Sequence, residues 1–227
     1  MKWKHWFREI RRRLGDPKKY VKTDEVSGQL QFEILKQEGC LPASRVLEVG
    51  CGCLHAGVPL MQYLEPGHFV GIEPNRWLLD KAMRAPPVAR LVAEKRPRFL
   101  HRFDFDASSL GVTFDYVLSH SVLSHAAHHQ LEQFLANTAK VLAPTGKICA
   151  SLRLAEGNAF GSTGSADKKD SLDKEWVYPG ISWFTKTTVE STADRVGLRA
   201  TYRPDYTEFY TRTRPKEIHD WFVFTRR

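Results

Sequence analysis

The chain has 227 residues, of which 42% are hydrophobic and 26% are charged, a balance that excludes a disordered, collagen-like or coiled-coil protein. No apolar run approaches the roughly 20 residues of a membrane-spanning helix, and the charged start of the chain lacks the apolar run of a signal peptide. The net charge of +8 lies almost entirely in residues 1–22, which hold nine Lys/Arg and two acidic residues, so the rest of the chain is close to neutral.

Residues 1–14 have the pattern of a basic amphipathic helix, which Gly15 and Pro17 end. Its cations surround an apolar arc of about 100° on a helical wheel, formed by Trp3, Trp6, Phe7, Ile10 and Leu14. Such a helix suits an anionic membrane surface, with its tryptophans at the level of the headgroups. Two alternatives stay open: the apolar arc packs on the chain's own domain, or the arm binds nucleic acid.

The body, residues 23–227, alternates predicted strands and helices at lengths suited to right-handed crossovers. Strands are predicted at residues 45–49, 68–72, 98–105, 114–118, 147–154, 198–202 and 221–225, and helices at 24–36, 54–64, 77–83, 127–142 and 187–196. This pattern predicts a single α/β domain with a doubly wound, mostly parallel sheet and helices on both faces. An irregular insertion at about residues 155–182 interrupts the alternation, and we expect it to act as a lid.

The cysteines and histidines do not have the spacing of disulfide or metal sites. Cys51 and Cys53 lie in a glycine-rich turn with no second pair at zinc spacing, and no carboxylates accompany His125, His128 and His129. We therefore expect reduced thiols in a cytoplasmic protein and no metal.

A glycine-rich segment, Glu48-Val49-Gly50-Cys51-Gly52, ends the first predicted strand. Its glycines let the backbone approach a ligand closely, and the carboxyl end of the first strand is where open α/β sheets bind ligands. Glu73 ends the second strand, where a carboxylate can accept hydrogen bonds from ribose hydroxyls. The glycine spacing differs from Gly-x-Gly-x-x-Gly, so no pyrophosphate cradle is indicated.

These segments resemble S-adenosylmethionine-dependent methyltransferases of the Rossmann-like class, or class I. Four pieces match in the family's order and at its spacing, namely residues 46–52, 71–74, 114–118 and 141–147. The resemblance implies S-adenosylmethionine as cofactor and S-adenosylhomocysteine as product. It also implies a seventh strand antiparallel to the others, a place that residues 221–225 fit.

The resemblance assigns cofactor-binding positions residue by residue. Glu48, Gly50, Cys51 and Gly52 match the motif that holds the methionine part of the cofactor, and Glu73 matches the acid that binds the ribose.

The family usually has a further acid after the third strand, near the adenine amino group. Asp104 and Asp106 compete for that position, and Asp106 fits the common layout better. Helix capping or simple solvation is the alternative role of either carboxylate.

A histidine-containing segment, residues 119–129, follows the fourth predicted strand. In the family this segment borders the cofactor's sulfonium and the acceptor, so Ser119 is assigned to the cofactor and His120 and His125 to catalysis. The enzyme mainly aligns the acceptor and excludes water, and a hydroxyl or protonated amine also benefits from a base such as histidine. Alternatively, His120 packs against the cofactor and His125 caps the next helix.

The leading hypothesis is an enzyme that methylates a small-molecule or lipid-like acceptor, at oxygen rather than at nitrogen or carbon. Tyr206 and Tyr210, between the last two strands, are weaker candidates for the acceptor pocket. A nucleic-acid methyltransferase is disfavoured because the body is nearly neutral and Ser-His-Ser replaces the Asn/Asp-Pro-Pro-Tyr/Phe motif of amino-directed DNA enzymes.

A non-catalytic cofactor-binding module is the alternative from another class. The expected location is cytoplasmic, or peripheral at a membrane if residues 1–14 dock there.

Overall fold

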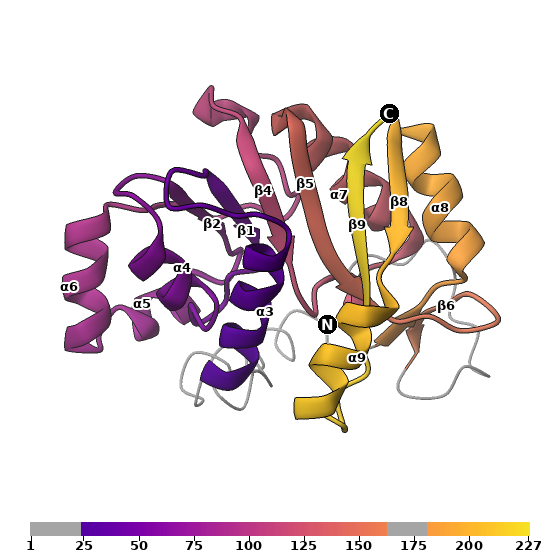
Figure 1. Cartoon of the computed structure of the whole chain (residues 1–227), viewed down its shortest axis with the longest axis horizontal. Coiled ribbons are helices and arrows are strands. Elements are labelled where there is room, and N and C mark those ends of the chain that lie inside the picture. The colour runs from indigo at the N-terminus through magenta and orange to yellow at the C-terminus, as the bar shows by residue number, and fades with distance from the viewer. Residues whose placement is uncertain (1–23, 163–180) are drawn as a thin grey trace, which may run out of the picture.

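A computed structural model describes residues 24–162 and 181–227 of the chain. The predicted N-terminal helix and most of the insertion lie outside these residues. A seven-stranded sheet of strand order β3-β2-β1-β4-β5-β9-β8 runs through the molecule (Figure 1). Its strands are β1 (Val46–Val49), β2 (Phe69–Ile72), β3 (Arg98–Leu100), β4 (Phe114–Ser119), β5 (Leu142–Leu152), β8 (Leu198–Tyr202) and β9 (Asp220–Arg226).

The last strand, β9, pairs antiparallel with both β5 and β8, whereas the pairs from β3 to β5 are all parallel. The sheet therefore confirms the prediction of a mostly parallel, seven-stranded fold with an antiparallel last strand. Because β9 runs against the others, its first residues lie at the sheet edge where β4 and β5 end. The register Ser151↔Trp221 records this arrangement.

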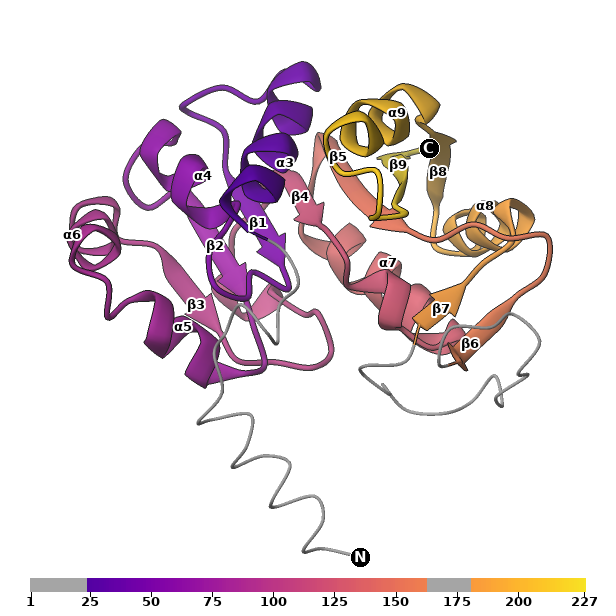
Figure 2. The same ribbon diagram turned by 90° about the horizontal axis from the view of Figure 1, so that it is seen from below.

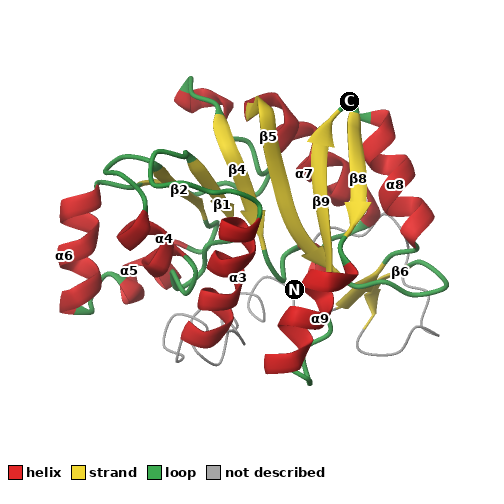
Figure 3. Cartoon of the chain, in the orientation of Figure 1, coloured by secondary structure: helices red, strands yellow, loops and turns green. Residues whose placement is uncertain are grey.

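Helices cover both faces of the sheet (Figures 2 and 3). One face carries α3 (Glu25–Gln37), α4 (Gly57–Tyr63), α6 (Pro86–Lys95) and α9 (Pro204–Thr213), and the other carries α7 (His128–Val141) and α8 (Lys186–Arg195). The helix α5 (Arg76–Ala82) follows β2. Each face of the sheet buries its own apolar cluster, as expected for parallel strands that are covered on both sides.

Three local predictions were wrong. The third strand ends at Leu100 instead of residue 105, and the loop after it turns at Phe105, whose φ is +61°. The predicted helices omit the segment between the last two strands, which forms the helix α9 and buries Tyr206 and Tyr210 one turn apart. The insertion contains a two-stranded sheet of β6 (Ala159–Ser162) and β7 (Ile181–Trp183).

The helix α3 is fixed closely against the loop that precedes α4. The Asp24 carboxylate accepts a hydrogen bond from the Ser27 amide at 3.0 Å and caps the helix. A Cβ atom at Gly28 would lie 2.0 Å from the carbonyl oxygen of His55, so only glycine permits this approach. This contact sets α3 beside the glycine-rich segment.

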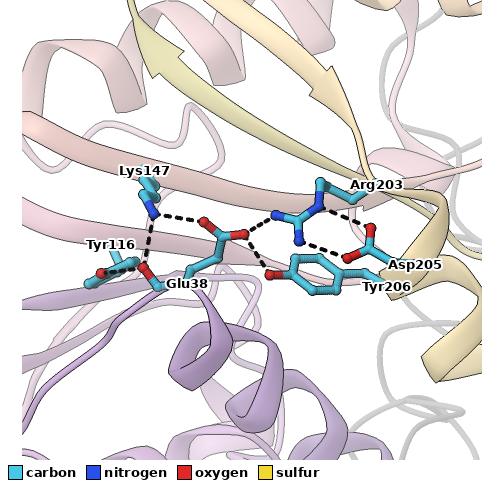
Figure 4. Close-up of polar contacts among 6 residues, drawn as sticks. All are labelled: Glu38, Tyr116, Lys147, Arg203, Asp205 and Tyr206. Carbon is cyan, nitrogen blue, oxygen red and sulfur yellow. Dashed lines mark hydrogen bonds and ion pairs between the residues drawn. The ribbon is translucent and has the colours of Figure 1, made fainter.

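A buried carboxylate, Glu38, joins α3 to β5 and α9 (Figure 4). It accepts hydrogen bonds from Lys147 Nζ at 2.8 Å and Tyr206 Oη at 2.6 Å, and it pairs with the guanidinium of Arg203. Burial acts to raise the pKa of Glu38, but the hydrogen bonds from Lys147 and Tyr206 and the two cations outweigh it, so the pKa is lowered. The Asp205 carboxylate accepts two further hydrogen bonds from the Arg203 guanidinium, from Nε and from Nη2. The network fastens the start of α9 over the sheet.

None of the helices within residues 24–162 and 181–227 is both long enough and apolar enough to cross a membrane.

Candidate functional site

The glycine-rich segment connects the ends of β1, β2 and β4. Gly50 has a φ of +77°, and a Cβ atom there would lie 2.3 Å from Val122 Cγ2, in the loop after β4. The amides of Gly50 and Cys51 both donate to the carbonyl of Ile72, at 2.8 and 3.1 Å. Glycine at position 50 is therefore required twice, for its backbone conformation and for the close approach of the β4 loop.

Glu73 lies buried at the end of β2 and accepts hydrogen bonds from the adjacent loops. The Gly52 amide donates to its Oε2 at 3.0 Å, and the amide and side chain of Asn75 donate to its Oε1 at 2.8 and 3.1 Å. Burial raises the pKa of Glu73, although these hydrogen bonds oppose the shift. A carboxylate has about four acceptor positions, so one position on Oε2 remains for a ligand hydroxyl.

Glu48, on β1, is buried on the face that carries α3 and α4. Its Oε2 has no hydrogen-bond partner among the described residues. Burial, helped by repulsion from Glu73, raises the pKa of Glu48 to about 8. An unpartnered buried carboxyl beside a glycine-rich loop is a group that a cationic ligand would satisfy. Together, the free positions on Glu48 and Glu73 fit the sulfonium cofactor with its ribose.

Cys51 is engaged with the protein itself. Its amide donates to Ile72, its carbonyl accepts from Leu54 at 2.8 Å, and its thiol packs against Gly71. Burial raises the pKa of this thiol well above its usual value. The structure therefore gives Cys51 a role in shaping the loop through its backbone.

The two acids after β3 differ in their partners. Asp104 forms an ion pair with Arg102, with Oδ1 2.8 Å from Nε, and this bond lowers its pKa. The carboxylate of Asp106 accepts the Ser108 amide at 2.8 Å, at the start of the short 3₁₀ helix η1 (Ser108–Leu110), whose N-cap residue is Ala107. Neither Asp104 nor Asp106 is fully buried, so each carboxylate can accept further hydrogen bonds in the loop after β3.

At the end of β4, Ser119 and His120 point to opposite faces of the sheet because successive strand residues alternate. Ser119 Oγ and His120 Nε2 are both buried and lack hydrogen-bond partners within the described part of the chain. His120 stacks on Trp221 with ring centroids 5.6 Å apart. Ser121, with φ of +58°, then turns the chain away from the strand.

The surroundings of His120 come from segments far away in the sequence. His219 lies with its ring centroid 4.2 Å from that of His120, and Tyr210 of α9 lies 4.9 Å from it. Ser151 Oγ is 3.4 Å from His219 Nδ1 and accepts the Ser121 amide at 3.1 Å. Reasoning from the sequence missed His219 and Ser151 and gave Tyr210 only a weak place near the acceptor. No local pattern marks the first two, because neither belongs to a motif.

Both buried histidines are neutral near pH 7. Burial, reinforced by His219, lowers the pKa of His120 well below its usual value. Burial lowers the pKa of His219 to about 3, with further contributions from the charges of Arg153 and His125. His125 is thus within electrostatic range of His219. It lies in the 3₁₀ helix η2 (Leu123–His125), two residues before Ala127, whose amide donates to the Gln130 side chain at 2.9 Å.

Comparison with known proteins agrees with this geometry. Residues 47–148 match the model of a family described as a methyltransferase domain. An uncharacterized methyltransferase of Schizosaccharomyces pombe is 30% identical over 111 residues, which are 46% of this chain and 38% of the relative. The chain thus matches well under half the length of this curated relative.

Solved structures share the fold at low sequence identity. Magnesium protoporphyrin IX methyltransferase from Synechocystis, with bound S-adenosylmethionine, superposes with a TM-score of 0.60 at 16% identity, over 97% of this chain and 91% of the other. A glycopeptide N-methyltransferase gives 0.62 at 15% identity, over 88% and 90%. Mitomycin 7-O-methyltransferase gives 0.59 at 13% identity, over 89% and 54%.

Proposed function

We propose that this chain, which contains a class I methyltransferase domain at residues 47–148, is an enzyme that methylates a small-molecule or lipid-like acceptor at an oxygen atom. The cofactor of this domain class is S-adenosylmethionine. The observation that carries the proposal is the pair of buried carboxyls at the ends of β1 and β2. Glu48 Oε2 lacks a partner among the described residues, and Glu73 keeps one acceptor position beside Gly52.

When bound, S-adenosylmethionine supplies an already activated methyl group on sulfur. The tasks of the chain are to hold the acceptor in line and to exclude water. In the proposal, Glu73 accepts a ribose hydroxyl, Glu48 neutralises positive charge on the methionine part, and Asp106 or Asp104 lies towards the adenine. Gly50 and Gly52 leave room for the cofactor, and Ser119 offers its buried hydroxyl nearby.

We assign the acceptor side to His120 and His125. His120 is the stronger candidate because its Nε2 is buried at the end of β4 with no partner in the described residues. A neutral imidazole there can receive the proton of an acceptor hydroxyl as the new bond to the methyl carbon forms. Relatives in the same fold act at oxygen or at nitrogen according to their names, so the choice of oxygen rests on this histidine.

The test measures cofactor binding by calorimetry for the wild type and for Glu73→Gln. We expect the glutamine variant to lose about tenfold or more in affinity, because a hydrogen bond to a charged group contributes roughly 1.5–3 kcal/mol. Its one amide oxygen can accept either the Gly52 amide or the Asn75 donors, so the variant loses fewer hydrogen bonds than Glu73→Ala, which would leave all three donors unpaired. Urea unfolding of the variant checks that the fold is retained. The exposed Glu65→Gln is the matched control. Equal affinities in all three proteins would remove Glu73 from the site.

A second measurement separates an enzyme from a binding module. Cofactor labelled in the methyl group is incubated with the protein and a cell extract of small molecules, and the labelled product is identified. Binding without transfer to any molecule would favour the non-catalytic module, and labelled nucleic acid would favour the nucleic-acid enzyme.

We further propose that residues 1–22 form an arm beside one catalytic domain at residues 23–227, and that the arm docks on anionic membranes. The support is the charge of +7 in these 22 residues and the one-sided apolar arc of residues 1–14. Each cation near an anionic surface contributes about 1 kcal/mol, less at high salt. Deleting residues 1–15 should abolish salt-sensitive sedimentation with anionic vesicles but spare cofactor binding. A deletion that instead cripples cofactor binding would retire the membrane idea.

A further inference from the structure

The cation Arg153 lies immediately after β5, at the sheet edge that carries His120. It is two residues beyond Ser151, so its side chain lies on the same face of the sheet as the Ser151–His219 pair. The charge of Arg153 lowers the pKa of His219, in agreement with this placement on the same face. We propose that the methyl acceptor is a carboxylate-bearing small molecule and that Arg153 binds its carboxylate. This inference rests on the methyltransferase function proposed above.

The guanidinium of Arg153 has no counter-ion in the described part of the chain. Its Nε is buried and unpartnered, and burial lowers the pKa of the side chain even though Asp220 acts to raise it. The charge of Asp220 acts on Arg153, but no ion pair joins the two side chains, and each Asp220 oxygen already accepts one hydrogen bond. Oδ2 accepts the Leu154 amide at 2.8 Å, and Oδ1 accepts the Tyr202 hydroxyl at 3.2 Å. A half-buried cation without a partner is costly unless a ligand supplies the anion.

The neighbouring side chains on this face cannot supply that anion. His219 and His120 are neutral, and the Ser151 hydroxyl is already bonded to the Ser121 amide and to His219. Glu217, in the segment before β9, accepts the Tyr210 hydroxyl at 2.8 Å and pairs with Arg214. Arg153 is therefore a cation without an ion-pair partner in the described residues, next to neutral aromatic rings, and a singly charged anion would complement it.

Charge, and not donor geometry, favours a carboxylate over a phosphate. A guanidinium presents parallel N–H groups that match two oxygens of either anion. A phosphate dianion generally needs more positive charge than one arginine, such as a second cation or a helix N-terminus. A carboxylate held by Arg153 would also orient the rest of the acceptor towards His120, so the recognition would serve alignment.

The experiment first determines the class of the acceptor. A small-molecule cell extract is passed over an anion exchanger at pH 7 or at pH 2, and each fraction is offered to the full-length chain with methyl-labelled cofactor. A carboxylate-bearing acceptor is retained at pH 7 and flows through at pH 2, where it is neutral. We expect this behaviour. Activity that is retained at both pH values indicates a phosphate, and activity that flows through at both indicates a neutral acceptor; either result overturns the inference.

The second step links the acceptor to the arginine. With the active fraction, Arg153→Met should raise KM for the acceptor at least tenfold while cofactor affinity changes little, and Arg153→Lys should recover part of the loss. Arg199→Met, at an exposed position on β8, is the control. An unchanged KM in Arg153→Met overturns the role of Arg153. If Arg153→Met does not fold, an unchanged KM in Arg153→Lys overturns it, because a point charge cannot replace a paired guanidinium contact.

The outcomes also separate this inference from the proposed function. Methyl transfer to a neutral or phosphorylated acceptor leaves the methyltransferase standing and refutes the carboxylate. A chain that neither binds the cofactor nor transfers label refutes the proposed function, and the carboxylate inference falls with it.

Discussion

The edge of the sheet at which the parallel strands end has two halves, and these are built differently. The half that we propose for the cofactor comes from the short stretch between β1 and the start of α5, and its Glu73 carboxylate is already held by Gly52 and Asn75. The half that we propose for the acceptor brings together His120, Tyr210 and His219 from separate segments, and the charge of Arg153 acts on His219. Its buried polar atoms include His120 Nε2 and Arg153 Nε, which lack partners in the described residues.

This difference separates side chains whose positions are already fixed by hydrogen bonds from buried polar groups that still lack a hydrogen-bond partner. A carboxylate with three hydrogen bonds needs little reorganisation when a nucleoside arrives. Unpartnered buried groups, in contrast, cost free energy until a matching molecule satisfies them. In the proposed function, the first half binds the cofactor and the second half carries the specificity for the acceptor.

The largest expected effect tests the chemistry of the acceptor half. His120→Phe keeps an aromatic ring against Trp221 but removes Nε2, so kcat should fall by about 10²-fold or more, in the range of a lost general base. Cofactor affinity should change far less. Steady-state kinetics and calorimetry on the same preparation measure both quantities, with His125→Phe assayed in parallel. If both variants keep wild-type kcat at neutral pH, catalysis is alignment alone.

The next effect tests how tightly the cofactor half is packed. Gly50→Ala should cost roughly 2–4 kcal/mol of unfolding free energy, through backbone strain at φ +77° and the collision with Val122. Gly67→Ala is the matched control, because Gly67 has a φ of +83° and a Cβ atom added there would meet nothing within 4 Å. It should show only the strain, about 1–2 kcal/mol. Urea unfolding checks stability, and calorimetry should show cofactor binding weakened only in Gly50→Ala.

A smaller effect should destabilise the packing of α9, beside the half proposed for the acceptor, without affecting α4, beside the half proposed for the cofactor. Glu38→Gln removes the charge that holds Arg203 and Lys147, at an expected cost of roughly 1–3 kcal/mol, because the pair is only partly shielded from water. Hydrogen exchange should speed up in α9 while α4 stays protected. The pKa of Glu38 is lowered in the folded state, so its stabilisation is present above the unfolded pKa near 4.5 and is lost as pH falls. Equal exchange in both helices of the variant would contradict the assignment.

The smallest expected effect concerns the protonation of the Glu48 carboxyl group, in the half proposed for the cofactor. Because the pKa of Glu48 is raised from 4.5 to about 8, the folded chain holds this proton at pH 7 and loses stability as pH rises from about 4.5 to about 8. A cationic cofactor should ionise the group and release up to about one proton. Calorimetry in two buffers of different ionisation enthalpy measures that release. Glu48→Gln should abolish it, and proton release that persists in this variant would point to another group.

The sequence predicted the strand ends around Gly50 and Glu73 well because the signals there are local. A buried strand, two glycines and the acid that ends the next strand lie close together along the chain, and parallel strands bring their ends to one edge. Local signals were weaker for the loop after β3, where the turn at Phe105 ends the strand early. They were also weak for α9, whose two buried tyrosines were noticed but not interpreted as one helical face.

The sequence by itself determined the fold class and the positions of most strands along the chain, and it supplied the proposal that Glu48, Gly50, Gly52 and Glu73 bind the cofactor. Only the tertiary structure brought Tyr210 and His219 around His120. The physical reason is that β9 runs antiparallel to β5, which returns the segment before it to the catalytic edge, while Glu38 fastens α9 beside it. The spacing of residues along the sequence does not predict such contacts, because they depend on how elements distant in the sequence pack together.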